Sequence, residues 1–153
     1  MVTSSTIQSH PRLHQPSLDF APVVLIADDN RMIRELCREI LERDDLRVLT
    51  AANGDEALVL ADRWIVDVLV TDVAMPGLDG FGLLRALRCR YPGVSAIVMT
   101  GQADYHGRAL PEVATEHGVA WTLLKPFDAP LLWEAVRIQC EWGSGVSPRS
   151  TPR

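Results

Sequence analysis

Apolar and polar residues alternate along the middle of the chain in two periods, one typical of buried strands and one typical of amphipathic helices. Apolar runs of strand length occupy residues 23–27, 46–52, 66–71, 95–100 and 120–124. Apolar residues recur at helical spacing over residues 32–41, 53–64, 81–87, 105–117 and 131–140. Pro111 is expected near the start of the fourth helix or at a break in it, because proline lacks the N–H that a helix interior needs.

Five strand–helix units in succession predict an α/β fold, a (βα)5 arrangement with a parallel sheet and helices on both faces. The strands are mostly apolar throughout rather than alternating, which is typical of strands that are buried on both sides. Right-handed crossover connections leave few topologies for such a chain. We therefore predict a doubly wound parallel sheet in a single domain.

The two ends of the chain differ in composition from this central part. Residues 1–20 are rich in Ser, Pro, Gln and His, and residues 143–153 are mainly Gly, Ser, Pro and Arg. Neither segment has a helical or strand period, so both are predicted to be flexible extensions of one domain over residues 21–142. The eleven residues of the C-terminal segment are expected to be too few for an output domain.

Length, composition and charge argue against several classes of protein. The 153 residues contain no apolar run near the roughly 18 residues that span a bilayer, and the start lacks the apolar region of a secretory signal. The net charge of -5 argues against a nucleic-acid partner, which usually requires a basic face. Three cysteines, far apart, argue against a disulfide framework or a zinc site. We expect a cytoplasmic protein with neither a membrane nor a nucleic-acid partner.

The candidate chemistry lies where the predicted strands end. Asp28 and Asp29 follow the first strand, Asp72 the third, Thr100 ends the fourth, and Lys125 follows the fifth. In an open parallel sheet, ligands bind outside the carboxyl ends of the strands, so these side chains are expected to converge.

Three carboxylates in one place repel one another strongly. Two like charges about 4 Å apart cost about 4 kcal/mol at an effective dielectric constant of about 20. A divalent cation removes this cost, and a small set of oxygen ligands completed by water suits Mg²⁺ (or Mn²⁺). Phosphoryl transfer needs mainly positioning and charge stabilisation, which a bound cation, Lys125 and the Thr100 hydroxyl would supply to an attacking Asp72. We therefore expect Asp72 to accept a phosphoryl group.

Four motifs carry a resemblance to a known family. They are LIADDN at 25–30, TDVAMPGLDG at 71–80, VMTG at 98–101 and LKPF at 124–127. In order and spacing they resemble the response-regulator receiver domain of two-component signalling systems, over roughly residues 20–142. The resemblance implies a flavodoxin-like fold with strand order 2-1-3-4-5.

The resemblance also implies roles for individual residues. Asp72 is the implied phosphoacceptor, and the implied donor is a phosphohistidine on a sensor histidine kinase or a histidine phosphotransfer protein. Asp29, Asp72 and the backbone carbonyl of Ala74 are the implied direct metal ligands, with Asp28 acting through water. The family further implies that Thr100 moves onto the bound phosphoryl group and that the Lys125–Pro126 peptide bond is cis.

The sequence departs from the family pattern at two places. The family usually has an aromatic residue three positions before the lysine of the last strand, and here that position is Thr122. Trp121 is adjacent, but neighbouring residues of a strand face opposite sides. In addition, the stretch from 102 to 118 is longer than usual and contains Pro111. Our hypothesis is that phosphorylation changes the region of the fourth helix without an aromatic switch.

The leading functional interpretation is a response regulator that works alone, or a receiver excised from a hybrid kinase, and that docks an unidentified protein when it is phosphorylated. It catalyses only its own phosphorylation and dephosphorylation. Trp133 is a candidate contact for a homodimer. One alternative is a receiver-like module that binds partners without phosphorylation. Another is an aspartate-nucleophile phosphohydrolase, which needs a second acid at the position of Ala74 and is therefore disfavoured.

Overall fold

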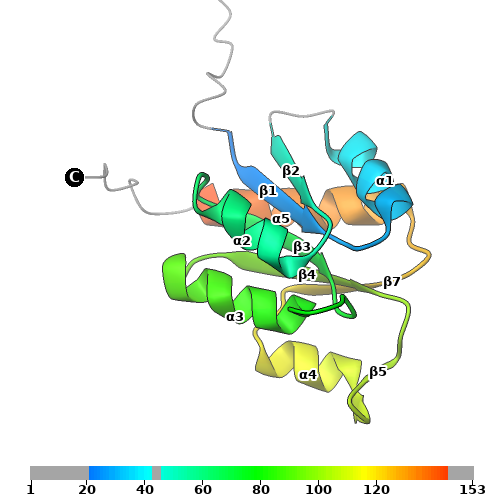
Figure 1. Ribbon diagram of the computed structural model, residues 1–153. Coiled ribbons are helices and arrows are strands. Elements are labelled where there is room, and N and C mark those ends of the chain that lie inside the picture. Colours follow the sequence, from blue (N-terminus) through cyan, green and yellow to red (C-terminus); the bar gives the residue numbers. More distant parts are fainter. Residues whose placement is uncertain (1–20, 43–45, 145–153) are drawn as a thin grey trace, which may run out of the picture.

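The computed structural model describes residues 21–42 and 46–144, which form a five-stranded parallel sheet flanked by helices (Figure 1). The sheet contains β1 (Val23–Ala27), β2 (Arg47–Ala51), β3 (Val68–Asp72), β4 (Ser95–Thr100) and β7 (Trp121–Leu124). They lie in the order β2-β1-β3-β4-β7, and all neighbours are parallel. Numbered by these five strands alone, the order is 2-1-3-4-5, which confirms the flavodoxin-like fold predicted from the sequence.

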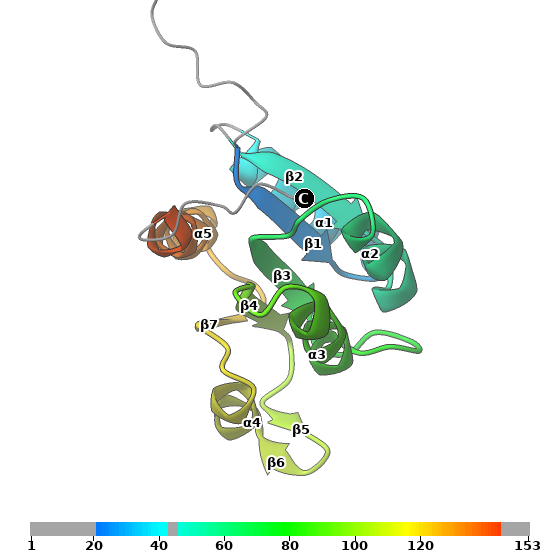
Figure 2. The same cartoon turned by 90° about the vertical axis from the view of Figure 1, so that its left-hand side faces the viewer.

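The helices alternate with these strands and cover both faces of the sheet. They are α1 (Arg31–Leu41), α2 (Gly54–Ala61), α3 (Gly80–Arg90), α4 (Leu110–Glu116) and α5 (Ala129–Ser144). Helices α1 and α5 lie on one face, and α2, α3 and α4 lie on the other (Figure 2). Every residue of β1 and β3 is buried, as expected for central strands with helices on both sides.

Alternate residues of each central strand contribute to different cores. In β1, Val24 and Ile26 pack with α1 and α5, whereas Leu25 and Ala27 pack with α2 and α3. A third cluster joins α4 to α3 through the fully buried Phe81. Helices therefore pack on both faces of the sheet, and the polar residues at the carboxyl ends of its strands lie together at one edge.

Three helices begin at a side-chain cap. Asn30, Asn53 and Asp79 each accept a hydrogen bond from a backbone N–H in the first turn of α1, α2 and α3. Helix α4 has no side-chain cap, and Pro111 lies in its first turn, where a missing N–H costs nothing. The prediction of Pro111 near a helix start is confirmed.

The prediction that the fourth helix begins at residue 105 is wrong. Residues 104–109 form a two-stranded antiparallel hairpin of β5 (Asp104–Tyr105) and β6 (Arg108–Ala109), and α4 starts only after it. The two residues of its turn, His106 and Gly107, have positive φ angles of 51° and 76°. Two successive residues with positive φ are the requirement of the tight turn that best matches the twist of a hairpin.

Other boundaries differ by a few residues. The third strand includes Asp72 as its last residue instead of ending before it. Helix α5 continues to Ser144, two residues into the predicted C-terminal extension. The predicted extensions at 1–20 and beyond Ser144 lie outside the described residues. Within the described part of the chain, none of the helices is long and apolar enough to cross a membrane.

Candidate functional site

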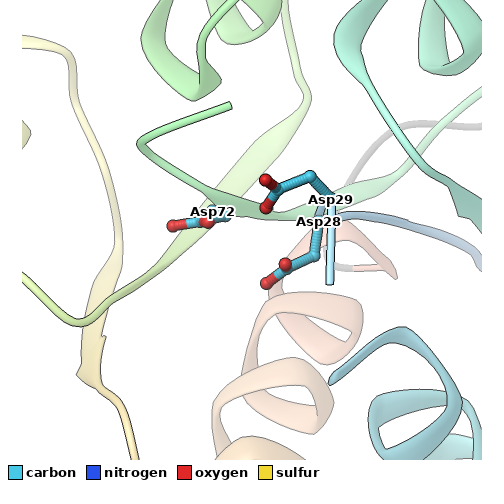
Figure 3. Close-up of side chains that lie close together, drawn as sticks. All are labelled: Asp28, Asp29 and Asp72. Atoms are coloured by element: carbon cyan, nitrogen blue, oxygen red, sulfur yellow. The ribbon is translucent and has the colours of Figure 1, made fainter. Parts of the chain in front are cut away.

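Three carboxylates meet at the carboxyl edge of the sheet. Asp28 and Asp29 directly follow β1, and Asp72 ends the neighbouring strand β3. One carboxylate oxygen from each lies within 4.8 Å of the others (Figure 3). Asp28 is fully buried and Asp72 nearly so, while Asp29 is exposed at the rim. The predicted acidic pocket is therefore assembled, and it opens to solvent on the side of Asp29.

Lys125 projects into this pocket from the end of β7. Its Nζ lies 2.6 Å from Asp28 Oδ2 and 3.4 Å from Asp72 Oδ2. The backbone of Lys125 is held by its N–H, which donates to the Thr100 carbonyl at 2.7 Å. One ammonium from the last strand of the sheet therefore bridges the carboxylates at the ends of the neighbouring strands β1 and β3.

The charges in the pocket shift the pKa of Asp72 and of Lys125. Burial raises the pKa of Asp72, and the repulsion of Asp28 adds to this effect, which the attraction of Lys125 only partly offsets. Burial alone would lower the pKa of Lys125, but its bonds to Asp28 and Asp72 outweigh burial and raise it. Three carboxylates and one ammonium leave the pocket with an excess of negative charge.

Both carboxylate oxygens of Asp28 have protein donors. Oδ1 accepts the N–H of Asn30 at 2.8 Å, and Oδ2 accepts the Lys125 ammonium. The loop that carries Asp28 and Asp29 is also held from α1, since the Arg34 guanidinium donates to both of their backbone carbonyls. Asp28 is thus a fixed part of the wall, and Asp29 is at the entrance.

Thr100 is at the expected edge but its hydroxyl is occupied elsewhere. The side chain is buried at the end of β4. Its hydroxyl oxygen accepts the N–H of Gln102 at 3.0 Å and donates to the Gln102 carbonyl at 3.2 Å. In this state the hydroxyl closes the first turn of the β4–α4 loop.

The structure also places the other positions that were singled out in the sequence. Ala74 is exposed, two residues beyond the end of β3. The Lys125–Pro126 peptide bond is cis. Thr122 is half-buried and pairs with Val98 of β4, while Trp121 packs into the core beside α1 and α5. Trp121 therefore does not replace the aromatic residue that is missing at Thr122.

Two further residues near the pocket did not emerge from the sequence. Asp79 caps α3, accepting the Gly82 N–H at 2.7 Å, and its other oxygen accepts the hydroxyl of Tyr105 from the hairpin. The cap has a sequence signal, because an Asp just before an apolar helical pattern is typical of a helix start. Tyr105 has none, since the hairpin that places it was predicted to be helix.

Comparison with known proteins agrees with this geometry. A family model described as "Response regulator receiver domain" matches residues 24–137. A response regulator receiver protein of Anaeromyxobacter sp. (strain Fw109-5) is 42% identical over 106 residues, covering 69% of this chain and 43% of that protein. The DNA-binding transcriptional regulator NtrC of Salmonella typhimurium is 34% identical over 106 residues, covering 69% of this chain and 22% of NtrC. The chain thus spans less than half the length of either relative.

Among solved structures, the receiver domain of AraT, a response regulator from Geobacillus stearothermophilus, superposes with a TM-score of 0.69 at 35% identity. This match covers 81% of the chain and 97% of the solved structure. The similarity thus extends over a whole receiver domain.

Proposed function

The chain belongs to the family of response regulator receiver domains, and from this premise we propose that Asp72 accepts a phosphoryl group from a phosphohistidine. Receiver domains are phosphorylation switches rather than enzymes, and histidine kinases phosphorylate them. The observation that carries the proposal for this chain is the position of Asp72. Its carboxylate ends a central strand at the open edge of the sheet, beside two carboxylates and 3.4 Å from the Lys125 ammonium.

The donor set fits a divalent cation of the Mg²⁺ type, because carboxylate oxygens close to one another are its preferred protein ligands. Asp29, Asp72 and the backbone carbonyl of Ala74 would hold Mg²⁺ (or Mn²⁺) directly. Asp28 would act through water, which agrees with the two protein donors that already bind its oxygens. When bound, the ion supplies positive charge that offsets the repulsion between carboxylates and incoming phosphoryl oxygens.

The residues of the chain supply the other requirements of the transfer. An Asp72 oxygen forms the new bond to phosphorus, the bond from phosphorus to the donor imidazole nitrogen breaks, and the electron pair of that bond stays on the imidazole. The Lys125 ammonium offers charge to a phosphoryl oxygen without giving up its proton. The Thr100 hydroxyl donates to another phosphoryl oxygen once it leaves Gln102. The product is an acyl phosphate on Asp72.

The signal is proposed to leave the molecule by phosphorylation-dependent docking to another protein in the cytoplasm. The donor is a sensor histidine kinase or a histidine phosphotransfer protein. The chain covers only part of the length of its curated relatives, so either action alone or action as the receiver of a longer protein is compatible with this proposal. A homodimer through Trp133 of α5 stays a prediction.

Mass spectrometry of the intact chain after incubation with acetyl phosphate and Mg²⁺ tests the proposal. The wild type is expected to gain one phosphoryl group, and Asp72→Asn none, because the variant has no nucleophilic carboxylate at that position. Asp55→Asn, in the first turn of α2, is a control that removes a carboxylate outside the pocket and should still be phosphorylated. Absence of any gain in the wild type would instead favour a module that binds partners without phosphorylation. Steady turnover of a phosphate monoester by the wild type would favour the phosphohydrolase.

A further inference from the structure

Tyr105 of the β5–β6 hairpin contacts the beginning of α3. The Tyr105 hydroxyl donates to Asp79 Oδ2 at 2.5 Å. Its ring meets the buried ring of Phe81 edge-on, with centroids 4.9 Å apart and planes at 76°. The side chain thus makes one polar and one aromatic contact with the same helix terminus, while it remains only half-buried.

The Asp79 end of this contact is fixed to the backbone that carries Asp72. Asp79 caps α3, and the next residue, Gly80, donates its N–H to the Val73 carbonyl at 3.0 Å. A Cβ added to Gly80 would lie 2.1 Å from the Asp72 carbonyl oxygen, so the helix terminus rests directly on the end of β3. Asp79 therefore keeps its place relative to Asp72.

The Tyr105 end belongs to the loop that begins at Thr100. Four residues separate Thr100 from Tyr105, and the Thr100 hydroxyl is bonded to the second of them, Gln102. The third, Ala103, accepts the N–H of Leu110 at 3.0 Å and so connects the loop to the start of α4. If the Thr100 hydroxyl leaves Gln102 for a phosphoryl oxygen, the bonds that set this short loop change, and Tyr105 is displaced relative to Asp79.

We propose that Tyr105 is a positioning residue that couples the state of Thr100 to α4, through a hydrogen bond to Asp79 that forms in the unphosphorylated chain and opens on phosphorylation. This inference rests on the proposed function of Asp72. It gives the chain an aromatic residue that responds to phosphorylation in the β4–α4 segment, in place of one at Thr122 in the last strand. This proposal is an alternative to the hypothesis of a response without an aromatic switch, which stays a prediction.

The hydrogen bond to Asp79 also changes the pKa of Tyr105. Its hydrogen bond to the carboxylate raises the pKa of the phenol, because ionisation would remove the donor proton and place two negative charges side by side. Opening the bond is expected to bring this pKa back toward its ordinary value.

The chain contains two tyrosines, which provides an internal control. The hydroxyl of Tyr91 donates to the Ala61 carbonyl at 2.8 Å, a contact between α2 and the end of α3. Tyr105→Phe removes one hydroxyl and keeps the ring that packs on Phe81. Tyr91→Phe makes the same chemical change at a hydrogen bond between α2 and the end of α3, outside the β4–α4 loop.

The experiment uses the whole chain labelled with 3-fluorotyrosine, with the two ¹⁹F resonances assigned from the two variants. Phosphoryl uptake from acetyl phosphate is measured first by mass spectrometry. Mg²⁺ and beryllofluoride, which imitates a phosphoryl group on the acceptor carboxylate, are then added while the fluorine spectrum is recorded. The Tyr105 resonance is expected to shift with beryllofluoride saturation, and the Tyr91 resonance is expected to stay in place.

Loss of the bond also predicts a change in affinity. The Tyr105–Asp79 bond stabilises only the unphosphorylated arrangement. Unlabelled Tyr105→Phe should therefore reach half-saturation at about a tenfold lower beryllofluoride concentration than the wild type. This factor corresponds to the weaker limit for a hydrogen bond to a charged group. Tyr91→Phe should bind as the wild type does.

The outcomes separate the two proposals. Phosphoryl uptake without a shift of the Tyr105 resonance, or with unchanged affinity in Tyr105→Phe, overturns the coupling and leaves the function of Asp72 intact. Absence of phosphoryl uptake overturns both. If Tyr105→Phe fails to fold, the fluorine spectrum of the labelled wild type, assigned from Tyr91→Phe alone, decides the question.

Discussion

The ion pair between Lys125 and Asp28 offers the sharpest test of how the pocket is held together. Lys125→Met removes the ammonium but keeps an unbranched apolar stem of similar length. Asp28 is left as a fully buried carboxylate that has lost its 2.6 Å partner, and Asp72 loses a partner at 3.4 Å. In the described part of the chain, the Asp28 side chain keeps its hydrogen bond from the Asn30 N–H.

The expected cost is large because the abandoned charge cannot reach water without rearrangement. Breaking a buried ion pair by removing one partner typically costs about 3–5 kcal/mol. The Lys125 side chain is 19% exposed, so the pocket is partly open and the lower limit applies. We expect the free energy of unfolding to fall by about 3 kcal/mol at neutral pH without divalent ions.

Urea unfolding of four proteins measures this effect: wild type, Lys125→Met, Asp28→Asn and the double variant. The double variant should recover about 2 kcal/mol relative to Lys125→Met alone, because a neutral amide replaces the unpaired charge. Arg31→Met is the matched control, since the Arg31–Glu35 pair has a similar distance of 2.7 Å but side chains 81% and 61% exposed, and it should unfold as the wild type does. The reasoning fails if Lys125→Met costs under about 1 kcal/mol, or if the double variant is no more stable than the single one.

The same edge of the sheet can be tested by three other perturbations. Gly80→Ala should lower the free energy of unfolding in urea by about 3 kcal/mol, because the new Cβ would lie 2.1 Å from the Asp72 carbonyl oxygen, which cannot move aside. A Cβ at Gly93 would meet nothing within 4 Å, so Gly93→Ala is the control and should leave stability unchanged; equal stabilities of the two variants would contradict the contact at Gly80. Asp72→Asn should be more stable than the wild type at neutral pH, because burial raises the pKa of Asp72 above its unfolded value of 3.8 and so makes the charged form costly in the folded chain. In unfolding measured against pH, this advantage should disappear as the pH falls through the folded pKa to below 3.8, and an advantage that grows on acidification would refute the prediction. In thermal unfolding, Mg²⁺ at a hundred times its dissociation constant should stabilise the wild type by about 2.7 kcal/mol. Asp29 is exposed, so Asp29→Asn should fold normally but lose most of this stabilisation. Equal stabilisation of both proteins would place the ion elsewhere.

Most of the fold could be predicted because burial on both faces leaves a strong pattern in the sequence. The runs that became β1 and β4 are apolar almost throughout, and they were placed at 23–27 and 95–100, the bounds that the structure has. The hairpin at 104–109 could not be predicted in this way. Its strands are two residues each and mostly exposed, so no periodic pattern marks them, and its turn uses His106 where Asn or Asp would have been a clearer signal.

For the site, the sequence predicts which residues come together but not the hydrogen bonds between them. Its residues could be predicted because the sheet topology brings the ends of parallel strands to one edge, and Asp28, Asp29 and Asp72 do meet there. Individual hydrogen bonds could not, because they depend on side-chain rotamers. The engagement of Thr100 by Gln102 and the bond from Tyr105 to Asp79 are set by loop geometry that appears only in three dimensions.

The bridge from Lys125 to Asp28 joins residues 97 positions apart, so the pocket is complete only when the first and last strands of the sheet are both in place. A nascent polypeptide that has not yet added its last strand has two of the acidic groups and the acceptor but no ammonium to complete them. A fragment cut ahead of β7 is in the same position. Under the proposed function, acceptance of a phosphoryl group by Asp72 would therefore require a chain that is synthesised and folded through β7.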